Sequence, residues 1–128
     1  MKKQTRRQQT KIWHCKPLLL DFDGVVHGYP EGHPFGFDLK DPMVPGAAQF
    51  ITEAHDFFDV SIYSARSIDT ISRELMKAYL RRNGVDPDRL GWPIYKPAAW
   101  LTIDDRCLRF DGRFPKAADL LQFKAWCE

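Results

Sequence analysis

Apolar runs that end at acidic or small polar residues recur along this chain. The first run, residues 17–22, is apolar except at Asp21, and continuous apolarity is typical of a strand buried on both faces. Further strands are predicted at 59–66, 91–95 and 99–105, and the last of these ends in two adjacent aspartates.

Between these runs, apolar residues return every three or four positions, which is the spacing of a helix. Residues 47–58 and 68–79 are predicted to be helical, and the Asn83-Gly84 pair is expected to end the second helix. The Asp111-Gly112 pair predicts a type I′ hairpin, and residues 117–125 a closing helix.

Alternating strands and helices predict an α/β fold, a three-layer Rossmann-like parallel sheet with helices on both faces. In such sheets ligands bind outside the carboxyl ends of the strands. Asp21, Ser64 and Asp104 each lie at the predicted end of a different strand. We therefore expect these three side chains to converge at one edge of the sheet.

The 128 residues are enough for one domain, which we place at residues 17–128. Residues 27–45 are rich in His, Gly and Pro, and a loop of this length inside a domain is usually functional. We expect a flap over about residues 27–44.

Residues 1–16 form a basic N-terminal arm. Residues 1–20 hold six basic residues and no acid, whereas the rest of the chain holds 13 basic and 17 acidic residues. Two interpretations stay open for the arm: a solvated terminus, or a segment that guides a nucleic acid end.

No apolar run approaches the roughly 20 residues of a membrane helix, so we expect a cytoplasmic protein without membrane contact. Cys15, Cys107 and Cys127 have no paired spacing and are expected to be reduced thiols. The sequence leaves both a monomer and a homo-oligomer open.

The acidic residues carry the candidate chemistry. Asp21 and Asp23 are two positions apart, so an extended backbone would point both side chains the same way, and Asp104 and Asp105 would join them. Two such charges 4 Å apart repel by about 4 kcal/mol at an effective dielectric near 20. Mg²⁺ prefers oxygen ligands and removes this repulsion, so we expect a Mg²⁺ site.

A carboxylate beside a metal is suited to phosphoryl transfer, because it can attack phosphorus while the metal neutralises the phosphate. Ser64 can hydrogen-bond a phosphate oxygen, and Lys96 can neutralise another. Asp23 can protonate the leaving oxygen and later activate water.

Four motifs in order, "LLLDFDG", "VSIYSAR", "YKP" and "LTIDDR", resemble those of the haloacid dehalogenase superfamily. The resemblance implies that Asp21 is the nucleophile and a Mg²⁺ ligand. It implies that Asp23 is the acid/base, with its carbonyl on the metal, and that Asp104 completes the metal site, with Asp105 supporting it directly or through water. Ser64 and Lys96 would bind phosphate, and Gly24 would permit the turn after the strand.

The chain departs from the family pattern in two respects. Val25 replaces the threonine that often follows the glycine, and the intervals between motifs leave no room for a large cap domain. We therefore expect a capless member with an open site. Similar "SAR" and "DDR" strings occur in the 3′-phosphatase domain of polynucleotide kinase-phosphatases and in small bacterial and phage hydrolases.

The leading hypothesis is a phosphomonoester hydrolase whose substrate is a nucleotide, a nucleic acid 3′-phosphate end or another small phosphate. By the same resemblance Arg66 would contact substrate, and a salt bridge to a nearby acid is the alternative. A non-catalytic phosphate-binding or phospho-acceptor module of the same fold is the second hypothesis. Receiver domains share a parallel sheet and a Lys-Pro pair, but there the acidic pair comes first and Lys-Pro last.

Overall fold

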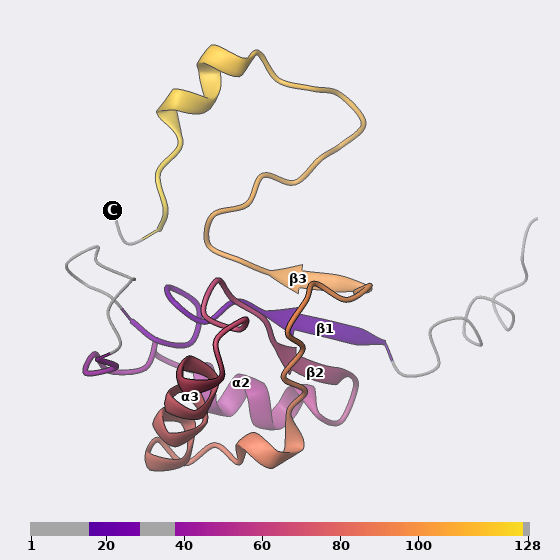
Figure 1. The fold of residues 1–128 in the computed structure, drawn as a ribbon. Helices are drawn as coiled ribbons and strands as arrows, with labels where there is room; N and C mark the ends of the chain where they lie inside the picture. Colours follow the sequence, from indigo (N-terminus) through magenta and orange to yellow (C-terminus); the bar gives the residue numbers. More distant parts are fainter. Residues whose placement is uncertain (1–15, 29–37, 127–128) are drawn as a thin grey trace, which may run out of the picture.

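A three-stranded parallel sheet lies at the centre of the structure, a computed structural model that describes residues 16–28 and 38–126 (Figure 1). The strand order is β2-β1-β3. The elements in chain order are β1 (Pro17–Leu20), α2 (Ala47–Ala54), β2 (Asp59–Ile62), α3 (Thr70–Arg82), the 3₁₀ turn η1 (Pro87–Arg89), β3 (Leu101–Ile103) and the 3₁₀ turn η2 (Ala117–Gln122).

The central strand β1 is buried as its apolar pattern predicts. Leu18, Leu19 and Leu20 are each 1% exposed, because neighbours flank this strand on both sides. In the parallel register Leu20 pairs with Ile62 of β2 and with Ile103 of β3. The three strands therefore end together at one edge of the sheet.

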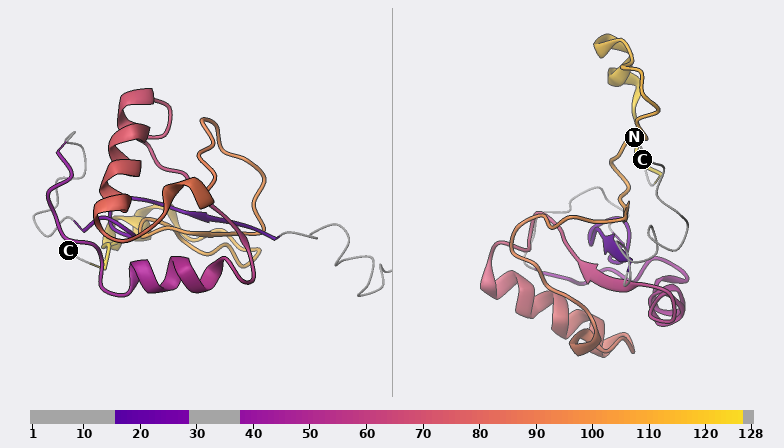
Figure 2. Two further views of the ribbon diagram at one scale, coloured as in Figure 1. Left: turned by 90° about the horizontal axis from the view of Figure 1, so that it is seen from below. Right: turned by 90° about the vertical axis from the view of Figure 1, so that its right-hand side faces the viewer.

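The two helices lie on opposite faces of the sheet (Figure 2). Ile51 of α2 packs into the core from one face, and Met76, Tyr79 and Leu80 of α3 line it with side chains at most 1% exposed. The expected α/β architecture, a parallel sheet with helices on both faces, is confirmed at this level.

The ends of α3 follow from local chemistry. The Asp69 carboxylate accepts a hydrogen bond from the Ser72 amide at 2.8 Å, which satisfies a backbone donor of the first turn. At the other end Gly84 has a φ of 83°, a conformation that L side chains rarely adopt. The predicted stop at Asn83-Gly84 is confirmed.

Two predicted elements are wrong. The strand at 91–95 is reduced to a single bridge between Gly91 and Ser61, because Pro93 cannot donate to a ladder. No hairpin forms around Asp111-Gly112: Gly112 makes a turn with a φ of 102°, but Pro115 follows, and neither flank pairs with a strand in the described residues.

The predicted closing helix at 117–125 is also wrong, because η2 is a 3₁₀ turn whose residues are all exposed. Helices depend mainly on packing of their apolar face, and η2 lies away from the sheet and its helices (Figure 1). The chain then returns to the sheet, where the Trp126 indole N–H donates to the Gly24 carbonyl oxygen at 2.7 Å.

The expected flap lies partly outside the described residues, which omit 29–37, and the basic arm lies outside them except for Lys16. Both described ends of the flap are joined to each other. The Gly28 amide donates to the Pro42 carbonyl at 3.0 Å, and the Val44 amide to the Val26 carbonyl at 2.9 Å. The loop therefore leaves and re-enters the fold at neighbouring positions.

Candidate functional site

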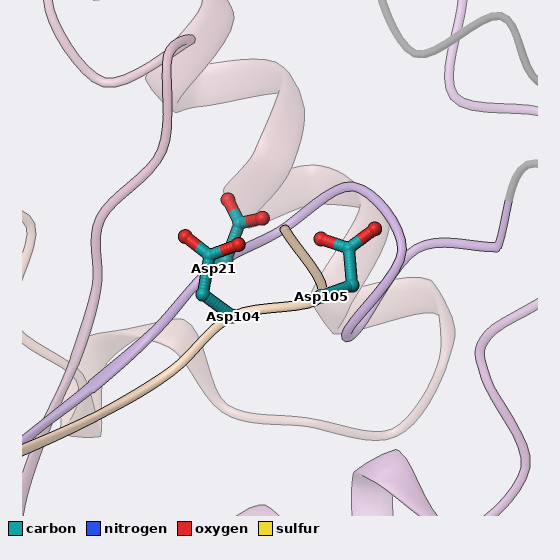
Figure 3. Close-up of side chains that lie close together, drawn as sticks. All are labelled: Asp21, Asp104 and Asp105. Atoms are coloured by element: carbon teal, nitrogen blue, oxygen red, sulfur yellow. The ribbon is translucent and has the colours of Figure 1, made fainter. Parts of the chain in front are cut away.

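Three carboxylates converge where β1 and β3 end (Figure 3). Asp21 directly follows β1, and Asp104 and Asp105 directly follow β3. The Asp21 amide donates to the Ile103 carbonyl at 3.0 Å, so the ladder between the two strands continues as far as the site. One oxygen from each of the three carboxylates lies within 4.8 Å of the other two.

The electrostatics of this group centre on Asp21. Burial raises the pKa of Asp21 to about 7, and nearby Asp104 and Asp105 add to the shift by repulsion and by a hydrogen bond from Asp105. A proton relieves the repulsion among these oxygens. A cation would relieve it in the same way.

The donor set fits a hard divalent cation. Carboxylate oxygens are the ligands that Mg²⁺ and similar ions prefer, and a site with two or three of them leaves room for water. Asp104 is exposed, whereas Asp21 and Asp105 are partly buried. The group is therefore open to solvent on the Asp104 side. One Asp104 oxygen accepts the Arg106 amide at 2.8 Å, which holds the turn after β3.

Asp23 faces a different environment. Arg66 donates to both of its oxygens, from Nε at 2.6 Å and from Nη2 at 3.0 Å, and His27 Nδ1 lies 2.9 Å from Oδ1. Burial works to raise the pKa of Asp23, but the hydrogen bonds from His27 and Arg66 outweigh it, and the pKa is lowered. Asp23 is therefore ionised at neutral pH.

The expectation that Asp21 and Asp23 point the same way stays a prediction, but Asp23 does not join Asp21 in the group of converging carboxylates. Period-two alternation holds only in extended backbone, and β1 ends at Leu20. The amides of Val26 and His27 both donate to the Phe22 carbonyl, which closes a tight turn here. The Asp23 carboxylate is consequently not one of the three that converge, and its expected metal contact through the backbone carbonyl stays a prediction.

His27 is the partner of Asp23 that the sequence analysis missed. Its ring is 2% exposed and packs against the rings of Phe22 and Tyr79, which also contact each other. Its Nε2 is 3.7 Å from an Asp41 carboxylate oxygen and has no hydrogen-bond partner among the residues that the structure describes. The available signal was the spacing of four between Asp23 and His27 just after a strand.

The remaining predicted residues make the following contacts. The Ser64 hydroxyl accepts the Arg66 amide at 3.0 Å and lies 3.9 Å from the sulfur of Met76. Lys96 is exposed, and no ion pair joins it to an acid in the described residues. Gly24, with a φ of 84°, makes the expected turn. Arg66 forms the salt bridge that was one of its two interpretations.

Comparison of the chain with protein-family models, with curated proteins and with solved structures found no match. Within residues 16–28 and 38–126, none of the helices is long and apolar enough to cross a membrane.

Proposed function

We propose that this chain is a capless member of the haloacid dehalogenase superfamily that hydrolyses phosphomonoesters through an aspartyl-phosphate on Asp21. The observation that carries the proposal is the convergence of Asp21, Asp104 and Asp105 where two parallel strands end. The four motifs in family order support it, as does a parallel sheet with helices on both faces.

The three carboxylates would hold Mg²⁺, which when bound neutralises the substrate phosphate and orients it. An Asp21 oxygen attacks phosphorus, the bond from phosphorus to the ester oxygen breaks, and the leaving oxygen takes a proton. Water then attacks the same phosphorus, the bond to Asp21 breaks, and inorganic phosphate leaves. Asp21 is thereby restored as a carboxylate.

Asp23 supplies the base in the second step. The Arg66 and His27 contacts keep it ionised, which is the form that accepts a proton from water. For the first step Asp23 must carry a proton, so its contact with Arg66 must loosen when substrate arrives. By the resemblance to the superfamily, Ser64 and Lys96 would bind the transferring phosphate.

The substrate class is an accessible phosphomonoester, such as a nucleotide or the 3′-phosphate end of a nucleic acid. The absence of a large cap from the sequence supports an open site, as does the exposure of Asp104. The basic arm is the part of the chain that would guide a nucleic acid end.

The test is phosphate release from p-nitrophenyl phosphate, from a panel of nucleotides and sugar phosphates, and from a 3′-phosphorylated oligonucleotide, each with Mg²⁺. Asp21→Asn is expected to lower activity at least about a thousandfold, because it removes the nucleophile. Asp56→Asn, at an exposed position between α2 and β2, is the matched control and keeps wild-type activity. Wild-type rates no higher than those of Asp21→Asn on every substrate would contradict the proposal.

A phospho-acceptor module is the second candidate, and one observation favours it. The Asp23 carboxylate is engaged by Arg66 through two hydrogen bonds, and a residue held in this way is a poor proton donor. Such a module would form an acyl phosphate on Asp21 and keep it. Treatment with acetyl phosphate and Mg²⁺ followed by mass spectrometry separates the two: a lasting adduct supports the module, and rapid turnover supports the hydrolase.

A further inference from the structure

The chain between β3 and Ala125 carries large apolar side chains on its surface. The six in question are between 45% and 90% exposed: Leu108, Phe110, Phe114, Leu120, Leu121 and Phe123. Single exposed leucines are ordinary, but a cluster of this size on one short segment is typical of an interaction surface. We refer to residues 106–124 as the C-terminal segment.

An apolar groove of about 280 Å³ lies on the α2 face of the sheet. Side chains from the sheet, from the turn after β1 and from α2 line it, among them Leu20, Val25, Val44, Phe50, Ile51 and Ile103. Phe50 is 41% exposed at this groove, and Leu101 on β3 is 46% exposed. In the described residues β3 also has no strand partner on its outer edge.

The C-terminal segment does not cover this groove in its own chain. It leaves the sheet after Asp105 and returns at Trp126, and between these points it projects away from the sheet and the two helices (Figures 1 and 2). In residues 16–28 and 38–126 of one copy, neither surface is covered.

We propose that two copies of this chain form a symmetric dimer, in which the C-terminal segment of each copy covers the groove and the outer edge of β3 of the other. A two-fold arrangement uses the same pair of surfaces twice and closes on itself. Leu108 and Phe110 alternate with polar residues, which is the pattern of a strand that adds to an open edge.

Charge supports the same pairing. The C-terminal segment holds five basic and two acidic residues, whereas residues 47–58, which include α2, hold two acidic residues and no lysine or arginine. A positive surface that meets a negative one favours association in a fixed orientation.

When the partner copy covers them fully, the exposed apolar side chains of the C-terminal segment supply the area that a stable dimer needs. At roughly 100 Å² each, the six exposed side chains of one segment present about 600 Å². Two segments and two grooves together exceed the roughly 1,200 Å² at which specific interfaces begin.

Sedimentation velocity of the full chain, in reducing buffer because Cys107 is exposed, measures the association directly. A dimer is expected at concentrations from about 1 to 100 µM. A monomer throughout this range overturns the proposal, and it is also the result expected if the segment folds onto the groove of its own copy.

Phe50→Glu in the groove and Phe110→Glu in the segment are each expected to weaken the dimer about tenfold or more, because each places a charge in an apolar contact. Both positions are exposed in the single copy, so the fold tolerates the change, and circular dichroism verifies this. Ile71→Glu, on the exposed side of α3, is the matched control and leaves the dimer unchanged. Equal dimerisation of all three variants contradicts the proposal.

Mixing the two variants tests whether the C-terminal segment of one copy covers the groove of the other. A Phe50→Glu copy and an affinity-tagged Phe110→Glu copy together retain one intact groove with one intact segment, whereas each variant alone retains none. The tagged copy is therefore expected to retain the other at concentrations where neither variant forms a dimer. Failure of the mixture to associate, with a wild-type dimer present, would place the interface elsewhere and overturn the proposal.

Discussion

Asp21 and Asp23 are two residues apart, yet their surroundings shift their pKa values in opposite directions. Asp21 lies beside two other acids and is partly buried, so its pKa is raised to about 7. Asp23 lies beside Arg66 and His27, so its pKa is lowered despite burial. These directions hold without a cation, and the nucleophilic role proposed for Asp21 needs its ionised form, which a cation bound by the three carboxylates would favour.

The raised pKa of Asp21 predicts how stability changes with pH. Between its ordinary value of 3.8 and about 7 the folded state binds the proton more readily than the unfolded state, so stability falls as pH rises through this range. From pH 5 to pH 8, in EDTA, the free energy of unfolding is expected to fall by on the order of 1–3 kcal/mol more in the wild type than in Asp21→Asn. Urea unfolding at the two pH values measures the difference, and equal losses in the two proteins would contradict the assignment.

The Asp23–Arg66 pair predicts a strong energetic coupling. Both side chains are at most 13% exposed, so Arg66→Met removes two hydrogen bonds from the buried Asp23 carboxylate and is expected to cost about 2–4 kcal/mol. The double variant Arg66→Met/Asp23→Asn is expected to recover part of this loss. Denaturant unfolding of the two single variants and the double variant measures the coupling.

Arg81→Met is the matched control for this cycle. Arg81 pairs with Asp88 at 3.3 Å, but the two side chains are 55% and 78% exposed. Arg81→Met is expected to lower the free energy of unfolding by no more than about 0.5 kcal/mol, because water already solvates both charges. Similar losses for Arg66→Met and Arg81→Met would show that burial does not strengthen the Asp23 pair.

Among the elements, α3 connects the core to the candidate site. Met76 is fully buried, and its sulfur lies 3.9 Å from the Ser64 hydroxyl in the turn that carries Arg66. Tyr79, one turn later, donates to the Asp41 carbonyl at 2.9 Å and packs against His27. The packing of α3 therefore positions the partners of Asp23.

Met76→Ala is expected to destabilise the fold by about 2–4 kcal/mol, because it leaves a cavity in the core into which the neighbouring side chains relax only partly. Leu75→Ala, one position earlier on the same helix, changes a side chain that is 37% exposed and is expected to cost less than about 1 kcal/mol. Thermal and urea unfolding compare the two variants. Equal losses would mean that this face of α3 does not pack as described.

At the scale of the whole molecule, the three carboxylates lie at the ends of two strands that are separated by some 80 residues of chain. A cation bound there would link β1 to β3 and stabilise the folded state over the unfolded one. At a concentration of 100 times its dissociation constant, a ligand that binds only the folded state adds about 2.7 kcal/mol.

Mg²⁺ is therefore expected to raise the unfolding temperature of the wild type, and Asp104→Asn is expected to remove most of this increase. Asp119→Asn, on the exposed turn η2, is the control that keeps it. Differential scanning calorimetry with and without Mg²⁺ checks both. An equal rise in wild type and Asp104→Asn would indicate that the ion acts elsewhere.

The sequence by itself determined the features that depend on local pattern. Continuous apolarity predicted the buried strand before Asp21, helical spacing predicted both packed helices, and Asn83-Gly84 predicted where α3 ends. The convergence of Asp21 with Asp104 also followed, because parallel strands that end together bring their next residues to one edge.

Only the tertiary structure decided which acid meets which partner. Asp23 and Arg66 are 43 residues apart, and their contact depends on the tight turn after β1 and on the turn after β2, neither of which has a periodic signal. The failed hairpin and closing helix have the same origin. A local pattern becomes a stable element only where another surface buries it, and among the described residues the C-terminal segment has no such surface.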